Sequence, residues 1–149
     1  MTSRHPAVSR AEGFCRAYDL QVPILLAPMA GACPPSLSMA VSNAGGLGGC
    51  GALLLPPAAI KAWAAELRAG SNGAFQINLW IPDPPPVRDA AAERRVRAFL
   101  DGWGPQVAAE AGDVTPPDFA AQCEAILEVG PPIVSSIMGL YPADFVARM

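Results

Sequence analysis

The chain has 149 residues, of which 52% are hydrophobic and 15% are charged, against roughly 25% charged residues in an average globular domain. This length and apolar content are typical of one domain with a single hydrophobic core. The net charge of -3 gives no basic surface to bind phosphates, and no apolar run reaches the roughly 18 residues of a membrane span, so we expect neither nucleic-acid nor membrane binding.

Residues 1–21 are interpreted as an N-terminal arm, with a short leading helix as the alternative, and residues 22–149 as the main domain. The arm holds the histidine of the chain, His5, which we expect to be a surface residue. It lacks the continuous apolar segment of a secretory signal. The four cysteines show no metal-binding spacing, which favours buried free thiols in a cytoplasmic protein. They are Cys15, Cys33, Cys50 and Cys123.

From Val22 onward, short apolar segments alternate with helical patterns. Continuous apolar runs are typical of parallel strands that are buried on both faces. The four expected strands are residues 22–27, 47–55, 74–81 and 133–137, and the helices begin near residues 34, 56, 87, 119 and 141. Strands that alternate with helices through short connections pair in parallel through right-handed crossovers, which predicts an α/β fold. The alternation alone does not distinguish a doubly wound sheet from a barrel.

Residues 46–51, with glycine at positions 46, 48, 49 and 51, match the dinucleotide-binding fingerprint G-x-G-x-x-G. In nucleotide-binding folds this fingerprint follows a strand and opens a helix. Here it follows an expected helix and continues into the apolar residues 52–55. We therefore interpret the glycines as a helix end that also allows close packing at the second strand. A phosphate-binding turn is the less favoured alternative.

Four motifs occur where the expected strands end, or at the end of the first expected helix. They are Ala27-Pro28-Met29, the stretch Val-Ser-Asn-Ala-Gly-Gly-Leu-Gly at 41–48, Phe-Gln-Ile-Asn-Leu-Trp at 75–80, and Val-Ser-Ser-Ile-Met-Gly-Leu at 134–140. Together they resemble the motifs of the nitronate monooxygenase family, formerly called 2-nitropropane dioxygenases. The resemblance implies the N-terminal half of an FMN-binding TIM (β/α)8 barrel with about four parallel strands. It also implies oxidation of alkyl nitronates by molecular oxygen.

The resemblance assigns flavin contacts to Ala27, Pro28 and Met29, whose backbone would lie against the ring, and to Asn78. A proline-stiffened turn can hold backbone groups against a planar ring, and an amide can donate to and accept from its polar edge. Gln76 would share the sheet face of Asn78 and is the second-line candidate. Each assignment has a purely structural alternative. Pro28 and Met29 could be a strand terminator and a core methionine, Asn78 could bond to its own loop, and Gln76 could be an interior amide.

The serines at 135 and 136 could line the floor of the same pocket or simply cap backbone groups. By the resemblance, the family's histidine base and its phosphate-binding loops lie after Met149, so we expect no catalytic residue here and a fragment that is inactive alone and binds FMN weakly. The alternatives are another FMN barrel enzyme, such as an enoyl-thioester reductase, and a non-catalytic interaction fragment. We also expect self-association through open sheet edges.

Overall fold

The computed structural model describes residues 5–85 and 87–149. The chain divides into two compact units, which we call the sheet unit and the helical unit. The sheet unit contains the described residues up to Ile81 together with Pro117–Met149, and the helical unit is Pro82–Pro116. Among the described residues, no helix has the length and apolar character needed to cross a bilayer.

The sheet unit is built on three parallel strands in the order β1 (Gly48–Gly51), β2 (Phe75–Trp80) and β3 (Ile133–Ile137). The bounds of β3 are those expected from the sequence, whereas β1 stops at Gly51 and does not include residues 52–55. Asn78 on the central strand pairs with Gly51 on one side and with Ser135 on the other. The parallel α/β arrangement predicted from the alternation is confirmed.

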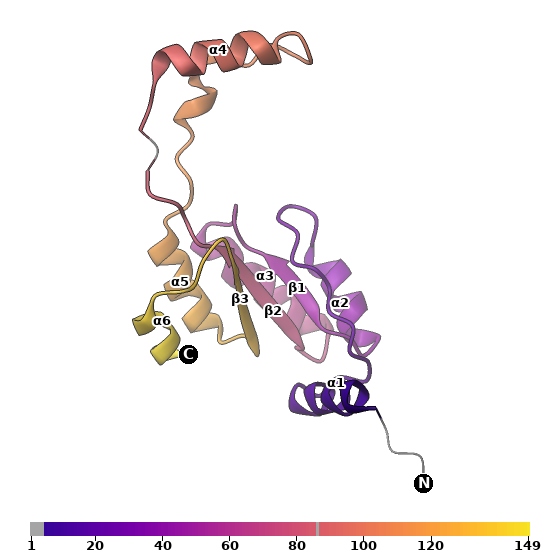
Figure 1. Ribbon diagram of the computed structural model, residues 1–149. Coiled ribbons are helices and arrows are strands. Elements are labelled where there is room, and N and C mark those ends of the chain that lie inside the picture. The colour runs from indigo at the N-terminus through magenta and orange to yellow at the C-terminus, as the bar shows by residue number, and fades with distance from the viewer. Residues whose placement is uncertain (1–4, 86) are drawn as a thin grey trace. The chain divides into compact units, whose positions relative to one another are not determined.

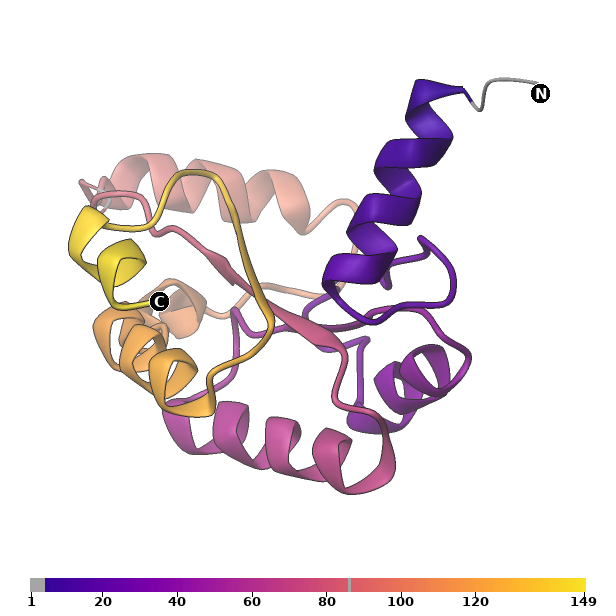
Figure 2. The same cartoon turned by 90° about the horizontal axis from the view of Figure 1, so that it is seen from below.

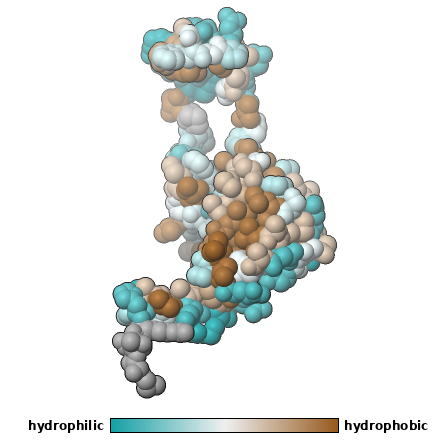
Figure 3. Space-filling view, turned by 90° about the vertical axis from the view of Figure 1, so that its right-hand side faces the viewer, coloured by the Kyte–Doolittle hydropathy of each residue, from teal (hydrophilic) through white to brown (hydrophobic). Residues whose placement is uncertain are grey.

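The expected first strand, residues 22–27, is an extended segment that meets β1 only at single positions. Leu25 forms a parallel bridge with Leu47, and Ala30 forms one with Gly51. The reason is local, because Pro23 and Pro28 have no N–H to contribute to a ladder of hydrogen bonds. Several apolar side chains of this segment are exposed, and Figure 3 shows apolar residues gathered in a patch on the face that it views.

Four helices follow one another along one side of the strands, as Figures 1 and 2 show. They are α2 (Pro35–Asn43), α3 (Pro57–Gly70), α5 (Phe119–Val129) and α6 (Ala143–Arg148). Proline stands in the first turn of α2 and of α3, where the missing N–H costs no helical hydrogen bond. Asp118 caps α5 by accepting from the amides of residues 120 and 121.

The main core lies between the helices and the face of β2 that carries Phe75, Ile77 and Leu79, all with 0% exposure. On α3 the buried residues are Ile60, Trp63, Ala64 and Leu67, which recur at helical spacing. Side chains alternate between the two faces of a strand. Gln76, Asn78 and Trp80 therefore project from the opposite face, which we call the inner face.

A second core cluster joins helix α1 (Pro6–Ala17) to the N-terminal ends of the strands. Cys15 and Leu20 pack there with Leu47 and Ala74, which directly precede β1 and β2, and Ile133 at the start of β3 contacts the cluster. The predicted arm thus contains the helix considered as its alternative. His5 is exposed and caps this helix, because its Nδ1 accepts from the amide of Ala7 at 3.2 Å.

The fingerprint glycines allow the chain to pack closely, as interpreted from the sequence. A Cβ atom on Gly49 would lie 2.6 Å from the carbonyl oxygen of Leu26, and one on Gly51 would lie 2.5 Å from the amide nitrogen of Ala30. Neither distance is compatible with a side chain. The absence of side chains at these two positions lets residues 26–30 lie directly against β1.

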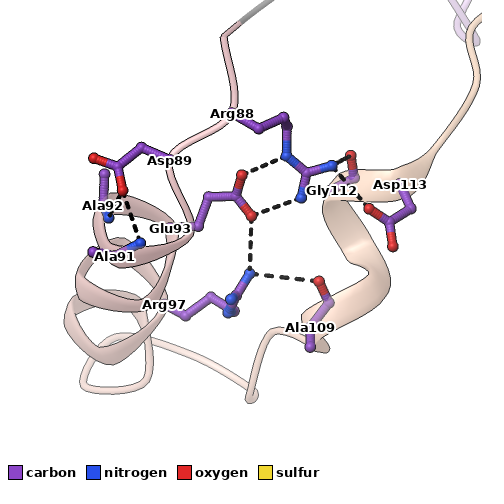
Figure 4. Close-up of polar contacts among 9 residues, drawn as sticks. All are labelled: Arg88, Asp89, Ala91, Ala92, Glu93, Arg97, Ala109, Gly112 and Asp113. Carbon is purple, nitrogen blue, oxygen red and sulfur yellow. Dashed lines mark hydrogen bonds and ion pairs between the residues drawn. The ribbon is translucent and has the colours of Figure 1, made fainter.

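The helical unit contains α4 (Ala90–Leu100) and the 3-10 helix η1 (Ala109–Asp113). Its centre is Arg88, shown in Figure 4, which bonds both oxygens of Glu93 and also donates to Asp113 Oδ1 at 2.8 Å. Arg88 holds the pKa of Glu93 below its ordinary value, chiefly through these hydrogen bonds. Glu93 also lies 3.8 Å from Arg97, one turn later along α4.

Candidate functional site

A cavity of about 160 Å³ lies at the C-terminal ends of the strands, which is the end that carries the chemistry in α/β barrels. Its lining is mostly apolar. The cavity is lined by Pro28, Ala30, Gly51, Leu53, Asn78, Trp80 and Ile137. Among these lining residues, Asn78 and Trp80 alone have polar side-chain atoms, an amide and an indole N–H.

The inner face carries a chain of hydrogen bonds next to this cavity. Asn78 Nδ2 donates to Ser135 Oγ at 3.0 Å, and Ser135 Oγ donates to Gln76 Oε1 at 3.1 Å. Gln76 Nε2 in turn donates to the carbonyl oxygen of Leu26 at 3.1 Å. These hydrogen bonds therefore link the strands β2 and β3 to the extended segment.

The thiol of Cys33 forms hydrogen bonds with two backbone groups of the loop that begins at Ala27. Cys33 Sγ donates to the carbonyl oxygen of Ala27 at 3.2 Å and accepts from the amide of Met29 at 3.4 Å. The carbonyl of Cys33 accepts from Trp63 Nε1 on α3 at 2.9 Å. Cys33 thus connects the backbone around Pro28 to the main core.

Replacing Cys33 by alanine should leave both of these backbone groups without a partner. Ala27 and Met29 are exposed residues and both contacts are only partly buried, so water can replace part of the lost hydrogen bonding. We therefore expect a loss of unfolding free energy of about 1 kcal/mol and faster hydrogen exchange at the Met29 amide. Cys33→Ser, which keeps a donor and acceptor, should lose less. Cys15→Ala is the control because that thiol is buried at the other end of the strands. An unchanged Met29 exchange rate in Cys33→Ala would contradict this role.

The loop after β1 is held by a buried amide on α5. Gln122 Nε2 donates to the carbonyl oxygens of Ala52 at 3.0 Å and of Leu55 at 2.8 Å, and its side chain is 4% exposed. These bonds explain why residues 52–55 leave the sheet, since their carbonyls turn toward α5. They also fix the position of Leu53 at the cavity wall.

Burial raises the pKa of the Cys50 thiol from 9.0 to about 12, with a smaller contribution from Cys33. The unfolded chain loses this proton above its ordinary pKa of 9.0, whereas the folded chain keeps it up to about 12. Unfolding free energy should therefore fall as the pH rises from about 9 toward 12, by at most about 1.4 kcal/mol per pH unit.

Urea unfolding at pH 8 and pH 10.5 measures this effect, and Cys50→Ala should reduce the difference between the two values. The remaining difference includes Cys123, whose pKa burial raises to about 11. All four cysteines are free and buried, as expected. Thiolate absorbance from Cys50 in the native protein at pH 9 would show that the thiol is not protected.

The structure brings some of the sequence-predicted flavin contacts to the cavity and leaves others beside it. Pro28 and Asn78 line the cavity, while Gln76 lies behind Asn78 in the hydrogen-bond chain. Ala27 and Met29 flank Pro28 and have their backbone groups bonded to Cys33. The flavin contacts themselves stay predictions. Sequence reasoning missed Trp80, although the two-residue alternation from Gln76 through Asn78 could have found it, and it missed the clamping role of Cys33.

Comparisons with known proteins identify the family of this chain. The family model described as nitronate monooxygenase matches residues 15–149. A nitronate monooxygenase from Paraburkholderia phytofirmans is 35% identical over 133 residues, covering 85% of this chain and 36% of the relative. One from Pseudomonas aeruginosa is 38% identical over 88 residues, covering 59% of this chain and 24% of the relative.

A solved structure of nitroalkane oxidase from Streptomyces ansochromogenes has the same fold over most of this chain. The TM-score is 0.72 at 26% sequence identity, and the match covers 91% of this chain and 39% of that one. The fold is thus that of part of a TIM-type barrel. The chain spans about a third of the length of the Paraburkholderia relative. The family match over nearly all of the described chain, on a fold shared with a nitroalkane oxidase, shows that this chain belongs to the nitronate monooxygenase family.

Proposed function

We propose that this chain supplies one wall of an FMN site in an oxidoreductase that oxidises alkyl nitronates with molecular oxygen. The observation that supports it most directly is the cavity at the C-terminal ends of the strands, where Pro28 and Asn78 meet. Both positions belong to the motifs that resemble the flavin-contacting segments of the family. Membership of the family favours nitronates over enoyl thioesters as the substrate class.

The lining of the cavity suits one edge of a flavin ring. Apolar groups from Pro28, Leu53 and Ile137 surround the amide of Asn78, and planar cofactors bind in apolar pockets with a few placed polar groups. The volume of about 160 Å³ is below the roughly 300 Å³ at which ligand pockets begin. The cavity would therefore take an edge of the ring, and groups outside it would have to hold the phosphate.

In this proposal the chain's residues position and shield the flavin, while bound FMN would supply the electron acceptor for nitronate oxidation. Pro28 stiffens the turn that faces the ring, and Cys33 fixes the backbone on either side of it. Trp80 and Ile137 line the same cavity and would contact this edge of the ring. No described residue of this cavity is an acid or a base that could remove a proton from a substrate.

Titration of the purified chain with FMN, followed by flavin fluorescence, tests the proposal. We expect weak but saturable binding, and Asn78→Leu should weaken it by about 10- to 100-fold because a polar group in an apolar cavity loses its partner. Gln106→Ala, an exposed amide in the helical unit, is the matched control. Absence of saturable FMN binding by the unmodified chain would refute the flavin site.

We also propose that the chain self-associates. Exposed apolar residues occur on the extended segment and after β3, with exposures of 63% for Ile24, 49% for Ile137 and 88% for Leu140. The net charge of -3 gives little repulsion between copies. Sedimentation at micromolar concentration should show dimers or larger species, and Ile24→Lys should shift the distribution toward the monomer. A monomer throughout the concentration range would refute this proposal.

A further inference from the structure

We propose that Ser135 is a positioning residue that sets the orientation of the Asn78 amide, so that Asn78 offers its carbonyl oxygen to the cavity as an acceptor for a ring N–H. The identity of the ligand, a flavin ring, rests on the proposed function. The orientation of the amide does not, because it follows from hydrogen bonds within the chain.

The orientation starts at a backbone carbonyl, which can only accept. Gln76 lies with an amide atom 3.1 Å from the carbonyl oxygen of Leu26, and that atom must be the NH2 group, since two carbonyl oxygens would repel each other. Gln76 is 7% exposed, so water cannot easily substitute for this partner. The Oε1 atom of Gln76 therefore points to the other side, toward Ser135.

The hydrogen bond between Gln76 and Ser135 determines which end of the Asn78 amide faces Ser135. Its hydroxyl has one hydrogen, and Gln76 Oε1, 3.1 Å away, can only accept it. The same oxygen, Ser135 Oγ, lies 3.0 Å from the amide of Asn78. With its hydrogen already used, Ser135 can only accept at this second contact. Asn78 must therefore present its NH2 group to Ser135.

The consequence is that the Oδ1 atom of Asn78 is directed away from Ser135. Among residues 5–85 and 87–149, no group donates a hydrogen bond to this oxygen. Because Asn78 lines the cavity, Oδ1 is the side-chain acceptor available to a ligand there. An asparagine could in principle show either end of its amide to a ligand, and here the contacts of Ser135 and Gln76 select the oxygen.

This polarity selects a ligand that has a hydrogen to donate. The oxidised isoalloxazine ring has several acceptors but a single ring N–H, at N3, which lies between two carbonyl groups. A site that presents an acceptor thus favours the N3–H edge, whereas a site that presented an NH2 group would favour a carbonyl or N5. The structure therefore assigns the imide edge of the ring to the Asn78 side of the cavity.

The ligand-free protein tests the relay by NMR measurement of side-chain amide exchange with water. In Ser135→Ala, the NH2 group of Asn78 should exchange at least about five times faster, because it loses its acceptor. The NH2 group of Gln76 should stay protected, because Leu26 still accepts from it. Ser135→Thr should preserve both rates. The Asn43 amide, bonded to the carbonyl oxygen of Gly70 at 2.9 Å, is an internal reference.

Faster exchange at Gln76 with no change at Asn78 would mean that the relay runs in the opposite direction, and it would overturn the proposal. Unchanged exchange at both amides would overturn it as well. Faster exchange at Asn43 would show that Ser135→Ala has lost its folded structure as a whole. In that case the proposal is tested in the wild type and in Ser135→Thr, where the Asn78 amide should be protected as strongly as the Asn43 amide. Weaker protection of Asn78 in both proteins would overturn the proposal.

FMN and its 3-methyl analogue test the ligand assignment, because methylation removes the N3 hydrogen. The wild type and Ser135→Thr should prefer FMN by about tenfold, and this preference should fall below about threefold in Ser135→Ala. An equal preference in wild type and Ser135→Ala would overturn the assignment. If the wild type binds neither compound, the flavin proposal fails, while the exchange rates still decide whether Ser135 orients Asn78.

Discussion

Alanine at position 75 should lower the free energy of unfolding by about 3–5 kcal/mol, the range for removing a buried phenylalanine. Phe75 opens the central strand and has 0% exposure. Its ring centroid lies 5.7 Å from that of Trp63, and the guanidinium carbon of Arg68 lies 5.2 Å above it. The substitution would thus leave a cavity and remove an aromatic and a cation–π contact at once.

Denaturant unfolding of Phe75→Ala gives the loss directly. Phe99→Ala is the control of identical chemistry, because Phe99 is 65% exposed on α4 and surface substitutions usually change stability by less than about 0.5 kcal/mol. Equal losses in the two variants would mean that the Phe75 contacts do not form the core of the sheet unit.

Gly51→Ala should separate the cavity wall, meaning residues 26–30 of the extended segment with Pro28, from β1. The new Cβ atom would lie 2.5 Å from the nitrogen of Ala30 and 2.6 Å from the carbonyl carbon of Met29. Both are backbone atoms, so no side-chain rotation relieves the clash, and the extended segment must move. We expect the bridge between Ala30 and Gly51 to be lost, together with any FMN binding at the cavity.

Hydrogen exchange across residues 24–33 and FMN titration measure the two effects. Gly104→Ala is the matched control, because a Cβ atom there would meet nothing within 4 Å. Wild-type exchange and FMN affinity in Gly51→Ala would show that close contact with β1 does not determine the position of the wall. The Cys33 substitutions alter the position of the same residues 26–30. Their effects on hydrogen exchange and FMN affinity should therefore not add to those of Gly51→Ala.

The regular parts of the fold could be predicted because their signals are local. Ile133–Ile137 is an uninterrupted apolar and small-residue run, and its bounds as a strand are confirmed. The buried face of α3 follows from apolar residues at helical spacing, and prolines mark the starts of α2 and α3. The alternation of such segments was sufficient for the parallel α/β arrangement.

The site was harder to predict from the sequence because its hydrogen bonds join residues that are far apart in the chain. Gln122 reaches the carbonyl of Ala52, 70 positions away, and Ser135 reaches Gln76, 59 positions away. The side-chain donors and acceptors at both ends are common residue types, and nothing local indicates their partners. The family motifs placed Asn78 at the site, but the direction of its amide depends on the chain of bonds that begins at Leu26.

The helical unit begins directly after β2 and ends directly before α5. Because β2 and β3 pair in parallel, α5 alone is enough to connect them as a βαβ crossover, without residues 82–116. Residues 82–116 therefore lie in the loop that follows the C-terminal end of β2 and contribute no residue to the strand pairing. In barrel folds the loops at this end of the strands carry the functional groups, so a change in the length or sequence of such a loop can alter ligand binding without altering the core.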